Sequence, residues 1–303
     1  MAIDRYEDDG SDTAIGPDDL REAEIGAGDR ATGSIDLEEI AANEIPAPDG
    51  IVEGENQTAY HLEYREVVEA VLLAAARERW DAAKPTLEAE WHEYALAHPA
   101  LVDVSPTLDD AAVTKVKKGC DRIAETEENI VTPAMLRIEA ADPERHLVGL
   151  EHRRKGQDRI MEKVAHDIQY KGRTTEDALA NLKDPIRYTF QYNDTQYVAG
   201  VNTDIGRLKA AGFGLVELRN SWSSTDYKGI NSRWRAPEEG QLFEVQFHTQ
   251  VSFEVKQLTH PTYERLRTPS IPKAEQAELL DFQRRANSYV PVPERVHDIP
   301  GYP

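Results

Sequence analysis

Acidic residues are distributed unevenly along this chain of 303 residues, and this uneven charge constrains its fold more than any other sequence feature. Residues 1–144 contain 12 Lys and Arg against 35 Asp and Glu, whereas residues 145–303 contain 23 against 21. The first part therefore has a formal charge of -23 and the second +2, which sum to the -21 of the whole chain. Such asymmetry predicts two parts with different tasks.

The acidic part itself divides into two regions. Residues 1–57 hold 17 acids and 3 bases among scattered Gly and Pro, which predicts a disordered acidic tail in which only 35–43 has the pattern of a short helix. Residues 58–142 are mostly strong helix formers with apolar residues at helical spacing, which predicts a helical regulatory or docking region. Pro85 is expected to divide 58–98 into two helices, and a further helix is expected over 108–128.

After residue 142 the pattern changes to alternating helices and strands. Helices are predicted over 159–169, 175–182 and 198–211. Strands rich in aromatic and β-branched residues are predicted over 186–192, 214–219, 230–235 and 242–248. This order predicts an α+β domain over 143–303, with a mixed β-sheet flanked by helices.

Composition excludes several classes of protein. A net charge of -21 excludes a uniformly basic face for nucleic acid, so any phosphate-binding surface must be local. The single cysteine, Cys120, excludes an internal disulfide and a multi-cysteine zinc site, and we expect it to pack as a small apolar side chain. No apolar run approaches the ~20 residues of a membrane span, and the first residues lack a signal pattern. We therefore expect a cytoplasmic protein without a membrane partner, although delivery to another cell by a non-classical route stays open.

Two segments place charged side chains near the ends of predicted helices and strands. Arg153 and Lys155 precede a predicted helix that carries Arg159 and Lys163 on one face, an arrangement that favours an anion site. Read alone, five cations in eleven residues are usually a solvated helix face. The second segment, 183–187, places an acid, Asp184, at the entry of a predicted strand with a cation three residues later.

Two further segments combine aromatic, amide and acidic side chains. In 226–231 a glycine follows Tyr227 and Lys228, which allows a close backbone approach. In the strand 242–248, Glu244, Gln246 and His248 point to one face, and the apolar residues between them point to the other. This alternation predicts the wall of a polar pocket, and the simpler alternative is the exposed face of an amphipathic strand.

The order and spacing of five segments resembles a known family. They are LEHRRKGQDRIMEK, KDPIRYTF, RNSWSSTDYKGIN, FEVQFHT and SFEVKQLTHPTYERLR, and together they span about residues 148–267. They resemble the pyrophosphate-transferring domain of the RelA/SpoT family, the alarmone synthetases, in its small and toxin-like branches. The resemblance implies a five-stranded mixed sheet akin to nucleotidyltransferases. It also implies transfer of the β,γ-pyrophosphate of ATP to the 3′-hydroxyl of an acceptor nucleotide.

The resemblance also implies roles for individual residues. Asp184 and Glu244 correspond to the catalytic and Mg²⁺-binding carboxylates, with Glu244 the base for the 3′-hydroxyl. The ATP-binding positions correspond to Arg153, Lys155, Arg159, Lys163 and Arg187. The acceptor-binding positions correspond to Tyr227, Lys228, Asn231, Gln246 and His248, with the Tyr227 ring stacking on the acceptor base. Mg²⁺ is the implied cofactor.

Two departures leave the acceptor open. Arg159 stands where the family commonly has serine, and Lys228 to Asn231 replaces a segment that usually contains histidine. GDP or GTP, an adenine nucleotide and the tRNA 3′ end all stay open, with tRNA disfavoured by the acidic charge. The hydrolase half of long family members is not visible, which is typical of a small synthetase or a growth-inhibiting toxin.

Other classes of function also stay open. The domain could be a catalytically inactive nucleotide-binding or assembly module, or another Mg²⁺-dependent phosphotransferase. Under each reading the acidic N-terminal half is available to a protein partner, whether an antitoxin, a regulator or a larger assembly.

Overall fold

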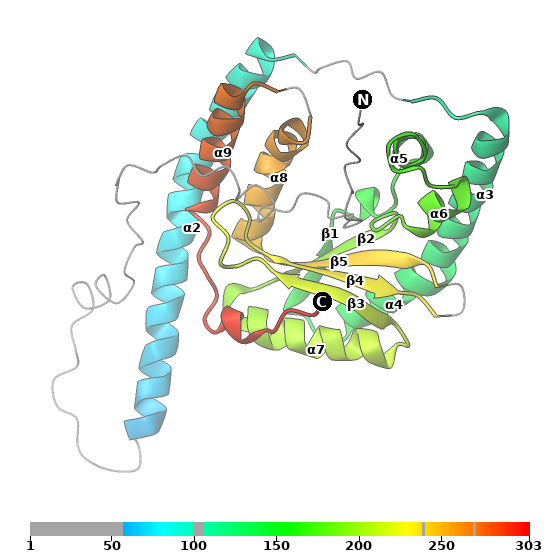
Figure 1. The fold of residues 1–303 in the computed structure, drawn as a ribbon. Coiled ribbons are helices and arrows are strands. Elements are labelled where there is room, and N and C mark those ends of the chain that lie inside the picture. The colour runs from blue at the N-terminus through cyan, green and yellow to red at the C-terminus, as the bar shows by residue number, and fades with distance from the viewer. Residues whose placement is uncertain (1–56, 100–105, 238–239, 269–270) are drawn as a thin grey trace, which may run out of the picture.

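A computed structural model describes residues 57–99, 106–237, 240–268 and 271–303, and a five-stranded β-sheet lies at its centre (Figure 1). The expectations for the acidic tail and for the short helix over 35–43 fall outside these ranges. The strand order is β1-β2-β5-β4-β3, with β2 and β5 parallel and every other neighbouring pair antiparallel. The predicted α+β class with a mixed sheet is confirmed.

Four of the five strands coincide with the predicted ones to within about two residues. The strands are β1 (Arg145–Val148), β2 (Arg187–Tyr192), β3 (Gly214–Asn220), β4 (Ile230–Arg235) and β5 (Leu242–Thr249). Runs of aromatic and β-branched residues marked the four longer strands in the sequence. β1 was not predicted, because four residues are too short to show a period.

Eight α-helices surround the sheet within the described ranges. They are α2 (Gln57–Ala97), α3 (Asp110–Thr126), α4 (Thr132–Ala140), α5 (Gln157–Lys171), α6 (Thr175–Ala180), α7 (Tyr197–Ala210), α8 (Gln250–Leu266) and α9 (Lys273–Asn287). A π-helical turn, Glu127–Val131, joins α3 to α4, and single 3₁₀ turns occur at Leu150–His152, Asp194–Gln196 and Val296–Asp298. α3, α5, α6 and α7 confirm predicted helices, whereas α4, α8 and α9 were not predicted.

The expected break at Pro85 is wrong. α2 continues through this proline as a single helix and runs beside α9 (Figure 1). Trp80 and Leu87, on either side of the proline, are both buried in the core. The Glu254 carboxylate of α8 also accepts hydrogen bonds from the Trp80 indole and the Lys84 ammonium. Packing on both sides offsets the roughly 3 kcal/mol that an interior proline costs a helix.

The helices lie on both faces of the sheet. α7 runs along one face, and α8 and α9 rise from the other (Figure 1). One buried apolar cluster includes Trp80 and Val116 from the helical region together with Phe190 and Phe247 from the sheet. Cys120 is a free thiol packed against this cluster, as expected. The division into domains at residue 142 stays a prediction. Within the described ranges, no helix combines the length and the apolar character needed to cross a bilayer.

Candidate active site

Backbone pairing brings the first two cationic segments of the sequence together. Arg154 and Ile186 form an isolated antiparallel bridge, which aligns residues 153–155 with residues 185–187. We call residues 153–155 the strap. The amide of Lys155 donates to the carbonyl of Pro185 (2.9 Å), and the amide of Arg187 donates to the carbonyl of Arg153 (2.7 Å). This pairing sets the Lys155 side chain beside the residue that precedes Pro185, namely Asp184.

Asp184 lies among three cations. Lys155 Nζ is 2.9 Å from both carboxylate oxygens, Lys163 Nζ from α5 is 3.5 Å away, and an Arg187 terminal nitrogen is 2.8 Å away. The Asp184 side chain is 20% exposed. Burial by itself would raise the pKa of this carboxyl, but the charges of Lys155, Arg187 and Lys163 outweigh burial and hold it below its ordinary value. The carboxylate is therefore ionised at neutral pH.

Glu244 joins this group through the register of the two parallel strands. Arg187 on β2 is aligned with Glu244 on β5, and its Nε donates to the Glu244 carboxylate. The same guanidinium therefore bonds both Asp184 and Glu244, and the negative charge of Glu244 is the main reason that the pKa of Arg187 is raised. We call Lys155, Lys163, Asp184, Arg187 and Glu244 the charged cluster.

A second, polar group lies farther along the same face of the sheet. The Tyr227 hydroxyl donates to Asn231 Oδ1 (2.8 Å) and lies 2.9 Å from His248 Nε2. The Tyr227 and His248 rings meet edge to face at a centroid distance of 5.6 Å. Gly229 packs against the same imidazole, since a Cβ there would lie 2.6 Å from His248 Cε1. The predicted close approach at this glycine is thus to a side chain of the protein.

His248, which lies beside the Tyr227 hydroxyl, is itself held in place. Its side chain is fully buried, and its Nδ1 lies 2.9 Å from Ser252 Oγ in the capping box that begins α8. Burial, reinforced by the positive charge of Lys256, holds the pKa of His248 well below its ordinary value, so the imidazole is neutral. The geometry therefore gives His248 the task of fixing the Tyr227 hydroxyl.

The side chains of three residues with implied substrate roles bind partners outside the charged cluster. Arg153 Nε donates to Glu127 (2.7 Å), an acid that the sequence did not single out. Arg159 is 75% exposed and pairs with the neighbouring Glu162. Lys228 Nζ donates to the carbonyl of Trp222 (2.8 Å). Their roles in binding ATP or acceptor stay predictions.

Two residues near the site were not recognised in the sequence. Glu127 has no exposed surface and accepts hydrogen bonds from Arg153, Arg154 and Tyr188. Lys256, on α8, donates to Gln246 Oε1 on β5 (2.6 Å). Glu127 is one of many acids in its region and gave no signal. Lys256 follows the end of β5 by two helical turns, a spacing that brings a helix back over its own strand.

The carboxylates of the charged cluster fit the expected metal. In the part of the chain that the structure describes, no three His, Cys, Asp or Glu side chains form a metal-binding group. Mg²⁺ needs only one or two protein carboxylates, because it retains waters and binds substrate phosphates. Asp184 and Glu244, bonded to one guanidinium, offer such a pair of oxygen donors.

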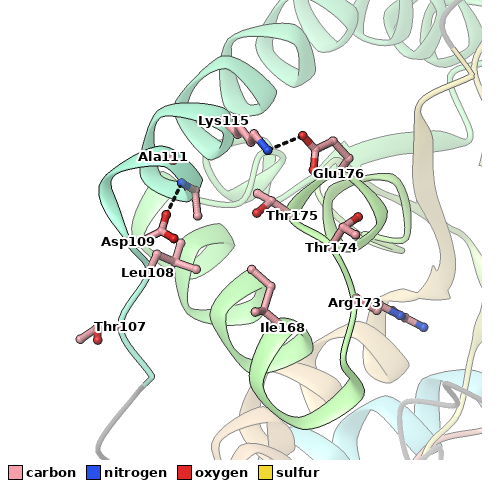
Figure 2. Close-up of a pocket in the computed structure, with 11 residues that line it drawn as sticks. Thr107, Leu108, Asp109, Ala111, Lys115, Ile168, Arg173, Thr174, Thr175 and Glu176 are labelled. Atoms are coloured by element: carbon pink, nitrogen blue, oxygen red, sulfur yellow. Dashed lines mark hydrogen bonds and ion pairs between the residues drawn. The ribbon is translucent and has the colours of Figure 1, made fainter.

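A cavity of about 500 Å³ lies elsewhere, between α3, α5 and α6 (Figure 2). Its walls include Lys115, Ile168, Arg173, Thr175 and Glu176. Lys115 and Glu176 pair with each other at 2.7 Å, so these two charges already compensate. No member of the charged cluster lines this cavity.

Comparison with known proteins gives structural likenesses only. No protein-family model and no curated protein matches the sequence. Among solved structures, the type VI effector Tas1 in complex with its immunity protein has 18% identity and a TM-score of 0.40, over 60% of this chain and 98% of that one. Small alarmone synthetase 1 from Bacillus subtilis has 16% identity and a TM-score of 0.38, over 59% and 91%. The protein smu.1046c from Streptococcus mutans has 15% identity and a TM-score of 0.36, over 63% and 92%.

The expected resemblance to small alarmone synthetases is therefore found. At these identities and TM-scores the likeness does not extend to substrate or activity. Evidence for the substrate and the activity must come from the side chains of the site itself.

Proposed function

We propose that this chain is an ATP-dependent pyrophosphokinase that transfers the β,γ-pyrophosphoryl group of ATP to the 3′-hydroxyl of an acceptor nucleotide. The charged cluster supports this proposal most directly. It joins two carboxylates, Asp184 and Glu244, through one guanidinium, and it adds two lysines on the Asp184 side. Pyrophosphoryl transfer needs this combination of cations for phosphate oxygens and carboxylates for a metal ion and a proton.

The proposed reaction forms one bond and breaks one. The acceptor 3′-oxygen attacks the β-phosphorus of ATP, a new oxygen–phosphorus bond forms, and the bond between the β-phosphorus and its bridging oxygen to the α-phosphate breaks. AMP leaves with the electron pair of that bond. The proton of the 3′-hydroxyl passes to the Glu244 carboxylate, which acts as general base.

The cations of the cluster bind and orient the phosphates of ATP. The strap places Lys155 beside Asp184, and α5 places Lys163 beside the same carboxylate. Arg187 forms the bridge to the second carboxylate, Glu244. Burial is the main cause of a lowered pKa at Lys155, opposed by the charge of Asp184. An anionic phosphate entering the cluster would likewise favour the charged form of this lysine.

Mg²⁺, held by Asp184 and Glu244 together with substrate phosphates, would supply additional positive charge for the transferred group. To bind Mg²⁺, Glu244 would have to give up its hydrogen bond with Arg187 at least in part. An arginine released in this way is well suited to bind a phosphate with two parallel hydrogen bonds.

Tyr227 supports an acceptor site next to the cluster. Its hydroxyl is held by Asn231 and His248, so its ring has a fixed orientation and can serve as a stacking platform for a base. Stacking on one ring accepts either purine, so both guanine and adenine nucleotides remain candidate acceptors.

The test is formation of AMP. The full chain is incubated with ATP and Mg²⁺ in parallel with GDP, GTP, ADP and deacylated tRNA, and AMP is measured by ion-exchange chromatography. We expect AMP and an equal amount of pyrophosphorylated product with at least one mononucleotide. AMP with tRNA alone would redirect the proposal to the tRNA 3′ end, and absence of AMP with every acceptor would refute it.

A further inference from the structure

The fold returns α8 over the strand that precedes it. α8 begins directly after β5, where Thr249 and Ser252 form a capping box. Gln246 lies three residues before Thr249, or about 10 Å along a strand, and Lys256 lies seven residues after it, or about 10 Å along a helix. The two side chains therefore meet above the sheet, where Lys256 Nζ donates to Gln246 Oε1 at 2.6 Å.

Lys256 differs from the cations of the charged cluster in the nature of its partner. Lys155, Lys163 and Arg187 each bind a carboxylate. Among the interactions of the described residues, Lys256 is instead held by the neutral amide of Gln246 and lies 5.3 Å from the centre of the Phe253 ring. An ammonium group has three N–H donors, and one bond to an amide leaves its charge uncompensated.

Lys256 lies on the Glu244 side of the cluster, because its partner Gln246 is two residues after Glu244 on the same face of β5. Burial lowers the pKa of Lys256 to about 8, and the charges that act on it most are Arg187, which lowers it, and Glu244, which raises it. Asp184 is bound by Lys155 and Lys163 from the direction of α5. Two lysines, one from the strap and one from α5, thus bind Asp184. A third lysine, Lys256 from α8, lies on the side of Glu244.

We infer that Lys256 is a further catalytic residue of the proposed pyrophosphokinase, whose ammonium group contacts the pyrophosphoryl group as it passes from AMP to the acceptor oxygen beside Glu244. This inference rests on the proposed function. In the transition state, negative charge spreads over the phosphoryl oxygens and the attacking and leaving oxygens. A cation already fixed at that place stabilises the charge without reorganisation.

This role predicts an effect on rate and little effect on ATP affinity. Lys155 and Lys163 lie on the Asp184 side and are assigned to bound ATP. Lys256 lies where charge develops, so its loss should lower kcat while leaving KM for ATP nearly unchanged. A lysine that only held Gln246 in place would instead change acceptor KM and the stability of the sheet.

The test compares Lys256→Met and Lys256→Arg with the wild type, using steady-state AMP formation by the full chain. We expect Lys256→Met to lower kcat by about 100-fold with KM for ATP within about threefold, and Lys256→Arg to recover most of that loss by keeping the charge. Lys115→Met, which removes a lysine of α3 in the separate cavity, is the matched control and should retain wild-type kcat.

Each outcome bears on the inference. Wild-type kcat in Lys256→Met, a loss confined to either KM, or a loss that Lys256→Arg does not reduce would overturn it while leaving the proposed function intact. A Lys256→Met variant with a lowered urea midpoint would be replaced by Lys256→Gln, for which the same kcat and KM criteria apply. If the wild type forms no AMP with any acceptor, the proposed function fails and the inference fails with it.

Discussion

Two carboxylates in this molecule, Asp184 and Glu127, each bind more than one cation and have different environments. Asp184 binds two lysines and an arginine and keeps 20% of its side chain exposed. Glu127 binds Arg153, Arg154 and Tyr188 and has no exposed surface. Both pKa values are lowered, because charge or hydrogen bonding outweighs the burial that would raise them.

The difference separates a reactive carboxylate from a structural one. Glu127 lies in the π-helical turn between α3 and α4, and its partners come from the start of α4, from the strap and from β2. It therefore ties the helical region to the sheet and is closed to solvent. The lysines at Asp184 keep 26% and 33% of their side chains exposed, so they can exchange the carboxylate for a phosphate and leave its oxygens to a metal ion. Buried charge alone thus does not mark a site; exchangeable partners do.

The largest expected effect comes from neutralising the exposed carboxylate. Asp184→Asn should lower AMP formation by about 1,000-fold, because an amide neither holds Mg²⁺ well nor balances the surrounding cations. The free energy of unfolding at pH 7 should change by much less than the activation free energy that corresponds to this loss of rate. Asp281→Asn, which removes an exposed carboxylate paired with Arg285 on α9, is the control. Wild-type turnover in Asp184→Asn would remove the distinction between the two carboxylates.

Neutralising the buried carboxylate should have the opposite balance. Glu127→Gln leaves Arg153 without its carboxylate and Arg154 with Glu128 alone, so we expect it to lower the free energy of unfolding by about 3 kcal/mol in urea titrations. Glu128→Gln is a matched control, since Glu128 is the next residue, pairs with the same Arg154 and is 60% exposed. It should change stability by less than about 1 kcal/mol. Equal effects of the two variants would contradict the structural role of Glu127.

The polar group beside the cluster can be disturbed without touching a charge. Gly229→Ala would place a Cβ 2.6 Å from His248 Cε1, so we expect a loss of about 2 kcal/mol in unfolding free energy and weaker acceptor binding through Tyr227. Gly206→Ala, in α7 with nothing within 4 Å of the new atom, should be neutral or stabilising. Similar behaviour of the two glycines would show that the His248 contact does not matter.

A third carboxylate, Asp194, tests the effect of burial on a group that has one oxygen without a hydrogen-bond partner. One oxygen of Asp194 is buried without a hydrogen-bond partner, and burial raises the pKa of this group to about 6. Because the folded state then holds the proton more tightly than the unfolded state, stability is lost as pH rises from about 4 to about 6. Relative to wild type, Asp194→Asn should gain about 1 to 2 kcal/mol between pH 4 and pH 7 in urea titrations. A difference independent of pH would disprove the raised pKa.

The sequence predicted the fold best where a pattern was long enough to detect. The aromatic and β-branched runs over 186–192, 214–219, 230–235 and 242–248 correctly placed β2, β3, β4 and β5, although only β4 alternates strictly between buried and less buried residues. β1 is too short for this, and the continuity of α2 through Pro85 depends on tertiary packing that no local pattern contains.

The site was predictable where its members are close in sequence. Asp184 and Arg187 are three residues apart, and the alternation in β5 identified the face of Glu244. Which acid each cation binds was not predictable, because that depends on the register of β2 against β5 and on a buried acid 26 residues before Arg153. Lys256 was missed for the same reason, since only the turn from β5 into α8 places it over the sheet.

The most direct test of the central claim is a single-turnover reaction of the full chain with ATP, Mg²⁺ and the best acceptor, comparing Glu244→Gln with Glu217→Gln. Glu217 is a matched control, because it also lies on the sheet and pairs with an arginine, Arg233. We expect AMP and pyrophosphorylated acceptor in equal amounts from wild type and Glu217→Gln, with neither from Glu244→Gln. Equal product formation by both variants, or no AMP from the wild type, would contradict it.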